Sequence, residues 1–184
     1  MSTSEFSKLM IARGMKELLK TAPLEAVSIG DLAKRCQVSR STIYYHFKDK
    51  YDIVRWIFQS EINPMVCSDR AAGDWTDNLM TMCQYMQRNR EFYTKVLQDG
   101  SQNIFYQSIV DFSQDLIQHM LLESERGSRL SQEEITMVSR IYSYGIAGML
   151  AQWSRKGMEA DPGIFVKTTK DLISGDIFEP HEHA

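Results

Sequence analysis

The feature that most constrains this chain is a pair of short helical segments near its N-terminus, separated by only three residues. Ser28 begins the first segment, and Asp31 follows three residues later, a spacing in which hydroxyl and carboxylate satisfy the free amides of a helix start. That segment ends near Cys36, and Ser39 begins a second one that runs through Phe47. Two short helices with a tight break are the outline of a helix-turn-helix, whose second helix enters the major groove of DNA.

The residues of the second segment divide between a buried and an exposed face. Ile43 and Phe47 are four residues apart, so both are expected to point inward onto Leu32. The opposite face is polar, aromatic and rich in hydrogen-bond donors. Hydroxyl and Lys side chains hold phosphate oxygens, whereas Arg and small polar side chains read base edges. The predicted DNA-binding residues are Ser28, Thr42, Tyr44 and Lys50 for phosphate, Arg40, Ser41, Tyr45 and His46 for bases, and Ser39 at the helix cap.

The charge distribution fits a protein that meets a polyanion with one end only. Residues 1–55 hold 10 Lys and Arg against 6 Asp and Glu, a net charge of +4, whereas the remainder holds 11 against 18, a net charge of −7. Such a difference also arises in ordinary helical proteins, so it supports DNA binding without establishing it. The exposed Tyr44, Tyr45 and His46 could equally form a protein-contact patch.

The rest of the chain favours helix throughout, so the sequence predicts an all-α protein of about nine helices. The first helix is expected from Phe6 to about Thr21, and the fourth from a cap at Asp49 to Pro64, which is expected to end or bend it. Ser131 and Glu134 have the spacing of a second capping box. The further helices are expected at about 74–88, 90–98, 103–125, 131–157 and 162–174.

This order of elements predicts two functional parts. Residues 1–50 are expected to form a three-helix helix-turn-helix domain, linked by the helix at about 49–63 to a helical-bundle domain within 51–184. The chain is long enough for one core, or for one core with a small satellite bundle. No stretch approaches the roughly 20 apolar residues that cross a bilayer. The sequence therefore predicts a cytoplasmic protein with no membrane partner.

Neither a metal site nor a cofactor site is predicted. The cysteines Cys36, Cys67 and Cys83 form no C-x-x-C pair, and their odd number does not support a disulfide framework. Each is better explained as a small buried apolar residue. His181 and His183 could bind a metal weakly, but a solvated chain end explains them as well.

The run VSRSTIYYHFKDK from Val38 to Lys50, preceded by SIGDLA at residues 28–33, resembles the N-terminal domain of TetR-type regulators. The resemblance covers roughly the first 60 residues, and a match of this length is far more specific than a generic helix-turn-helix pattern. It implies a DNA-binding transcription regulator. Gln37 departs from the family pattern, because it occupies a turn position usually taken by Gly. A left-handed conformation at Gln37 would cost about 1 kcal/mol.

The C-terminal part resembles a subgroup of the same family that includes activators of dihydroxyacetone kinase operons. The similar segments are YDIVRWI from Tyr51, FY at Phe92, GSQN from Gly100 and YGIAGM from Tyr144. This similarity is less specific than that of the N-terminal run. It determines neither the regulated operon nor whether the protein represses or activates.

The segment from Ile135 to Trp153 is apolar on more than one face and therefore needs two packing partners. One is the core of its own domain, and the other is expected to be a second subunit, as the family resemblance also implies. A two-fold dimer presents two recognition helices, which predicts a roughly palindromic operator. The candidate interface residues, from this helix and the last one, are Ile141, Tyr144, Gly148, Phe165, Thr169 and Leu172.

The resemblance also implies an effector cavity in the C-terminal domain, for a small molecule or a partner protein. Aromatic and Met side chains form apolar pockets with a few polar tips, although the same residues at helical spacing also make plain core. An effector acts if it binds the DNA-competent and incompetent dimer unequally. The candidate pocket residues are Trp75, Met82, Tyr85, Met86, Tyr93, Phe105, Tyr106, Met120 and Tyr142.

Two other functions fit a helical chain of this size. An enzyme is disfavoured, because the sequence has no Gly-rich phosphate loop, no G-x-S-x-G and no H-E-x-x-H. A protein-binding adaptor on the same fold, without sequence-specific DNA binding, is the alternative to a regulator.

Overall fold

The computed structural model describes residues 3–67, 75–98, 104–124 and 127–174. Within these ranges the regular elements are all helical, as the sequence predicts. No helix in the described part of the chain is both long and apolar enough to cross a membrane. The α-helices are α1 (Thr3–Thr21), α2 (Ile29–Cys36), α3 (Arg40–His46), α4 (Lys50–Cys67), α5 (Trp75–Arg88), α6 (Arg90–Gln98), α7 (Ile104–Glu123), α8 (Gln132–Arg155) and α9 (Pro162–Ser174), with 3-10 turns η1 (Leu24–Ala26) and η2 (Gly127–Arg129).

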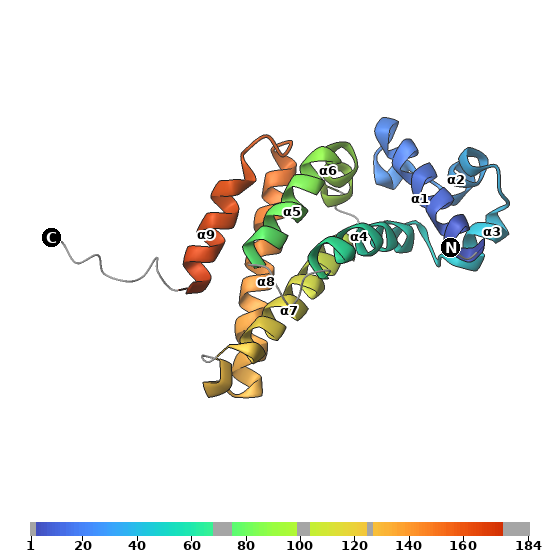
Figure 1. Cartoon of the computed structure of the whole chain (residues 1–184). Helices are drawn as coiled ribbons and strands as arrows, with labels where there is room; N and C mark the ends of the chain where they lie inside the picture. The colour runs from blue at the N-terminus through green and yellow to red at the C-terminus, as the bar shows by residue number, and fades with distance from the viewer. Residues whose placement is uncertain (1–2, 68–74, 99–103, 125–126, 175–184) are drawn as a thin grey trace.

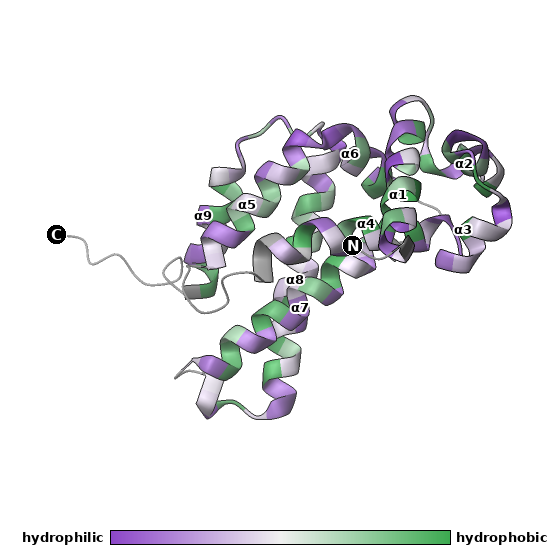
Figure 2. Ribbon diagram, turned by 45° about the vertical axis from the view of Figure 1, so that its right-hand side comes forward, coloured by the Kyte–Doolittle hydropathy of each residue, from purple (hydrophilic) through white to green (hydrophobic). Residues whose placement is uncertain are grey.

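The helices form two groups joined by α4. Figure 1 shows α1, α2 and α3 together at one end of the molecule, and α5 to α9 on the other side of α4. The long helices α7 and α8 pack side by side and extend furthest from the N-terminal group. Figure 2 shows hydrophobic and hydrophilic residues interspersed along α4 and α7, as expected for helices that bury one face.

The caps predicted from the sequence are present and set where the short helices begin. The Ser28 hydroxyl accepts the Asp31 amide at 3.1 Å, and the Asp31 carboxylate accepts the Ser28 amide at 3.1 Å. Ser39 accepts the Thr42 amide at 3.1 Å. Ser131 heads α8 with the predicted capping box as well. These contacts fix the starts of α2, α3 and α8, since each one satisfies an amide without a partner in the helix.

Helix α4 is longer than the sequence predicts. Asp49 caps its start by accepting the Asp52 amide at 2.8 Å, as expected. The helix then continues to Cys67 through Pro64, so the prediction that it could end at about residue 63 is wrong. A proline inside a helix removes one hydrogen bond and costs about 3 kcal/mol or more. Burial of the apolar face of α4, including Ile57 and Ile62, offsets that loss.

The turn between α2 and α3 has the left-handed conformation whose cost the sequence analysis considered for Gln37. Gln37 lies in the left-handed region, with φ 56° and ψ 40°. Its amide donates to the Lys34 carbonyl at 3.2 Å, and the Val38 amide donates to the Ala33 carbonyl at 3.0 Å. The Ala33 and Lys34 carbonyls near the end of α2 are thereby satisfied, as in helices that end on glycine.

Replacement of Gln37 by Gly is therefore expected to raise the free energy of unfolding by about 1 kcal/mol, because glycine has no Cβ to strain a left-handed residue. Urea denaturation measures the change. Gln84 is the matched control, since it is exposed inside α5, where the same substitution should lower stability by about 1 kcal/mol. If the Gln37→Gly protein is no more stable than the wild type, Gln37 is not strained by its left-handed conformation.

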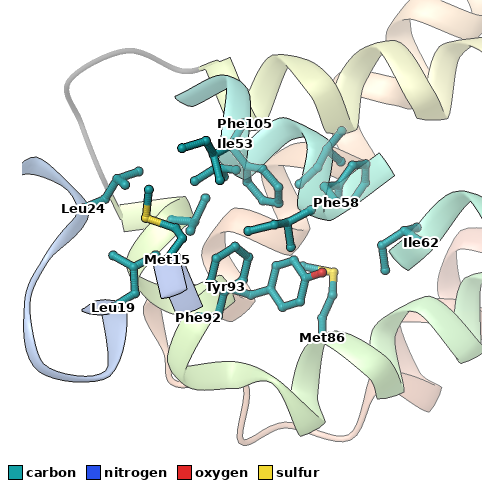
Figure 3. Close-up of a cluster of buried hydrophobic side chains, with 14 of the residues drawn as sticks. Met15, Leu19, Leu24, Ile53, Phe58, Ile62, Met86, Phe92, Tyr93 and Phe105 are labelled. Carbon is teal, nitrogen blue, oxygen red and sulfur yellow. The ribbon is translucent and has the colours of Figure 1, made fainter. Parts of the chain in front are cut away.

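The buried side chains form one cluster that crosses from the N-terminal group into the C-terminal helices. Figure 3 shows Met15 and Leu19 of α1 close to Phe92 and Tyr93 of α6, with Phe58 of α4 beside them. The helix-turn-helix therefore shares a core with the rest of the chain. The domain boundary near residue 50 stays a prediction. It would separate DNA binding from sensing and dimerisation, although both parts share one core.

Candidate nucleic-acid interface

Helix α3 has the two faces that the sequence predicts. Ile43 and Phe47 are buried, whereas Arg40, Ser41 and Tyr44 are exposed. Tyr45, also a predicted base contact, is 82% exposed. A large aromatic side chain so open to water is uncommon in a folded chain and is available to a partner.

The start of α3 gathers three hydroxyl groups. The Ser39 hydroxyl oxygen lies 2.7 Å from that of Ser41 and 2.8 Å from that of Thr42. Each hydroxyl is both a donor and an acceptor and can rotate, so the group can turn a proton toward an added acceptor. Phosphate oxygens are acceptors of this kind.

Arg40 lies across the start of α2 as well as at the start of α3. A Cβ added at Gly30 would lie 2.7 Å from Nη2 of Arg40, so the guanidinium passes directly over this glycine. The pKa of Asp31 is lowered, first by hydrogen bonds from Ser28 and to a smaller extent by the charges of Lys34 and Arg40. Gly30 thus leaves room for the side chain predicted to read bases, a role the sequence reasoning missed.

Lys50 has a different environment from the one expected of a phosphate contact. Its ammonium donates to the carbonyls of Leu24, Glu25 and Val27 at 2.8, 2.9 and 3.1 Å. Three donors are all that an ammonium has, so Lys50 fastens the segment before α2 to the start of α4. Its contact with phosphate stays a prediction. To make that contact, the ammonium would have to give up at least one of these three hydrogen bonds.

The remaining predicted DNA contacts, His46 and Ser28, already have contacts within the chain. His46 is half-buried, and its ring meets that of Tyr45 edge-on at 5.0 Å. Ser28 is exposed at the start of α2 but is used in the capping box. Lys8 of α1 adds a positive charge that sequence reasoning missed, since its ammonium lies 5.9 Å from the ring centroid of Phe47.

Exposed apolar side chains lie on α8 and on α9, and together they are called the apolar face of α8 and α9. Of the six predicted interface residues, Ile141, Tyr144 and Leu172 are exposed. Gly148 is half-buried, and a Cβ added there would meet only the Tyr106 hydroxyl, at 3.9 Å. At Gly145 a Cβ would meet nothing within 4 Å, so this stretch of α8 is open to another molecule.

The other two predicted interface residues are less accessible, and the open face holds residues not predicted. Phe165 is half-buried and Thr169 is buried, with its hydroxyl donating to the Phe165 carbonyl at 2.8 Å. Met137 and Ile164 extend the exposed apolar face. Met149 of α8 is also half exposed.

Four of the nine predicted pocket residues are part of the packed core. Met82, Met86, Tyr93 and Phe105 are buried in the core, and the rings of Tyr93 and Phe105 are 5.9 Å apart. Their role as effector contacts stays a prediction. The half-buried members are Trp75, Tyr85, Tyr106, Met120 and Tyr142, of which Tyr106 donates to the Tyr144 carbonyl and Tyr142 to the Leu172 carbonyl.

A cavity of about 500 Å³ lies between α4 and α7 and contains none of those predicted residues. The side chains of Phe58 and Phe112 supply its aromatic part, with ring centroids 5.9 Å apart. Gln107, Asp111 and Asp115 recur every four residues on one face of α7, a polar stripe typical of any exposed helix face, so the sequence contains no specific signal of this cavity. The lining residues are Arg55, Phe58, Gln59, Gln107, Ser108, Asp111, Phe112 and Asp115.

The described residues offer no cluster of three or more His, Cys, Asp or Glu side chains that could hold a metal ion. Cys36 and Cys83 are free thiols. Burial raises the pKa of Cys83 to about 12, so this thiol is protonated at neutral pH and is a poor nucleophile. His181 and His183 lie outside the described residues.

The exposed α3, its buried anchors and the helical companion domain define a helix-turn-helix DNA-binding protein. A family model described as bacterial regulatory proteins, tetR family, matches residues 11–57, and one described as transcriptional regulator C-terminal region matches residues 73–175. The chain belongs to the TetR family of DNA-binding transcriptional regulators, which confirms the resemblance seen in the sequence. It is a regulator and not an enzyme.

Individual relatives agree with this assignment. The HTH-type dhaKLM operon transcriptional activator DhaS of Lactococcus lactis subsp. lactis (strain IL1403) is 23% identical over 96 residues, or 52% of this chain, so the match spans about half (51%) of that relative. A solved structure of a dihydroxyacetone kinase operon activator DhaS has a TM-score of 0.68 at 18% identity, covering 93% of this chain and 96% of its own. Thermus thermophilus FadR in complex with lauroyl-CoA has a TM-score of 0.67 at 14% identity, covering 96% and 98%. At these identities the structures show a shared fold.

Proposed function

We propose that this regulator acts as a homodimer that binds a roughly palindromic operator through α3, under the control of an effector in the C-terminal domain. The observation that carries the proposal is the surface of α3. Ile43 and Phe47 are buried and pack α3 onto the core, whereas Arg40, Ser41 and Tyr45 are exposed. Arg and hydroxyl groups on one exposed helix are the side chains that contact bases and phosphates in a major groove.

The apolar face of α8 and α9 supports a second copy of this chain as partner. Ile141 is 63% exposed and Ile164 is 71% exposed, so both side chains lose contact with water if the faces of two subunits meet. The open Gly145 allows close approach of a helix from the other subunit. A two-fold axis through this face presents two α3 helices to two half-sites.

The cavity between α4 and α7 supports control by an effector. Helix α4 starts beside the helix-turn-helix and also supplies Arg55 and Gln59 to the cavity. A molecule that binds the cavity more tightly at one angle of α4 to α7 would shift the dimer between operator-competent and incompetent spacings. The effector is a small molecule or a partner protein. The lauroyl-CoA of the Thermus thermophilus structure belongs to that protein and identifies no effector here.

Selection of duplex fragments from a random pool, followed by titration of the recovered operator, tests the proposal. Replacement of Arg40 by Ala should weaken operator binding by about 1–3 kcal/mol and relax the base preference at one position. Tyr44→Ala should weaken binding to all duplexes about equally, since phosphate contacts are independent of sequence. Arg155→Ala is the matched control, because it removes an exposed Arg from the end of α8, far along the chain from α3.

The adaptor hypothesis predicts other results. An adaptor would recover no common sequence from the pool, and its weak DNA retention would respond alike to Arg40→Ala and Arg155→Ala. That outcome would reject sequence-specific regulation by α3.

A further inference from the structure

Lys16 belongs to α1, at the DNA-binding end of the molecule. Its positive charge lies at the junction with the C-terminal helices. Its ammonium, on α1, lies 2.6 and 2.7 Å from the two carboxylate oxygens of Glu61 on α4. The two side chains are only 22% and 27% exposed, so water and salt screen this pair less than a surface ion pair. The contact joins residues 45 positions apart in the chain.

Two aromatic rings complete the surroundings of this ammonium. It lies 5.3 Å from the ring centroid of Phe92 on α6 and 6.0 Å from that of Tyr85 on α5. A cation over an aromatic face is attracted by the negative charge of that face. Lys16 therefore contacts α4, α5 and α6 at once, and we call Lys16, Glu61, Tyr85 and Phe92 the Lys16 latch.

The latch has further hydrogen bonds on its carboxylate side. The Tyr93 hydroxyl donates to Glu61 at 3.5 Å. Burial raises the pKa of Tyr93, and the nearby charge of Glu61 raises it further. Burial also raises the pKa of Tyr85, with a hydrogen bond to Glu61 as the next cause. Both tyrosines thus stay protonated, and a protonated hydroxyl can donate to the carboxylate that holds Lys16.

A second contact holds the same end of α1. The Lys95 ammonium of α6 donates to the Lys20 carbonyl at 2.9 Å, one helical turn beyond Lys16. Two contacts along one helix restrain its direction as well as its position. Because α2 and α3 pack on α1, the direction of α1 sets where α3 points.

We propose that Lys16 is a positioning residue, whose pairing with Glu61 sets the angle of α1 on α4 and α6 and thereby the separation of the two α3 helices in the dimer. This inference rests on the proposed operator-binding dimer. The Lys16 latch lies away from the exposed residues of α3, so it acts on the geometry of binding and makes no contact that reads DNA. Loss of the latch therefore changes which half-site spacing the protein prefers.

The test measures binding of the full-length protein to the selected operator and to versions with the central spacer lengthened or shortened by a base pair or two. The wild type should discriminate among the spacers, and Lys16→Met should reduce that discrimination by about fivefold or more. The salt dependence should stay unchanged, because no phosphate contact is lost. Glu61→Gln should act like Lys16→Met, and the double variant should be no worse than either single one, since both remove the same contact.

Lys20→Met is the matched control. It removes the same charge from the same helix, but the partner of Lys20 is Glu17 on α1 itself, at 2.7 Å. Lys20→Met should therefore keep the spacer discrimination of the wild type. If Lys16→Met matches Lys20→Met in discrimination and differs only in thermal stability, the residue has a structural role and the proposal is overturned.

Failure of the proposed function gives a different result. If the wild type binds no duplex, operator binding is rejected, and hydrogen exchange of the α1 amides then decides the latch. Faster exchange in Lys16→Met than in Lys20→Met supports a latch that seats α1, whereas equal exchange contradicts it.

Discussion

Replacement of Ile141 by Glu is expected to convert the proposed dimer to a monomer and to weaken operator binding by about 100-fold or more. Ile141 is at the centre of the exposed apolar stripe of α8, and a two-fold axis through the proposed interface would bring each copy close to its equivalent. Two carboxylates would then be buried near each other without partners, which is costly. A monomer could bind only one half-site. Linking two binding modules raises the overall affinity by about 10²–10⁴, and this gain would be lost with the dimer.

Light scattering gives the mass, and an operator titration gives the affinity. The wild type should have twice the 21.3 kDa mass of the chain, and Ile141→Glu should have that mass once. Leu122→Glu is the control, because Leu122 is 57% exposed on α7, outside the α8 and α9 face. An Ile141→Glu protein that stays dimeric would show that the subunits meet elsewhere.

Replacement of Phe58 by Ala is expected to lower the free energy of unfolding by about 3–5 kcal/mol. Phe58 is buried in α4, and its ring meets the rings of Phe105 and Phe112 edge-on at 5.2 and 5.9 Å. Removal of the ring leaves a cavity and breaks both ring contacts. Because the buried cluster extends into α1, unfolding should remain a single transition for helix-turn-helix and C-terminal helices alike.

Urea denaturation followed by circular dichroism measures this loss. Phe6→Ala is the control, since Phe6 is 64% exposed on α1 and its truncation should change stability by less than about 0.5 kcal/mol. A loss below about 1 kcal/mol for Phe58→Ala, or two separate transitions in the wild type, would contradict a shared core.

The local features of the fold could be predicted from the sequence because they depend on residues close together in the chain. Ser28 with Asp31, Ser39 and Ser131 determine helix starts through contacts three residues long. At Gln37 the family resemblance pointed to a turn position usually taken by Gly, and the residue is left-handed. The inward direction of Ile43 followed from helical periodicity alone.

The features that sequence reasoning missed depend on distant packing. The continuation of α4 past Pro64 requires neighbours that cover its apolar face. The pairing of Lys16 with Glu61 and the passage of Arg40 over Gly30 join different helices. The three carbonyls around Lys50 likewise come from a turn that precedes it by more than 20 residues. Side-chain type could place these residues on a surface, but only the tertiary fold assigns their partners.

The most direct test of the claim that α3 reads DNA is a protection footprint of the wild type on a fragment recovered by selection. We expect two symmetric protected half-sites, with centres separated by one or more helical turns of about 10.5 base pairs. Protection should weaken steeply as salt is added, because cations are released from the phosphates on binding. A folded, dimeric protein that protects no site even at low salt would contradict the account.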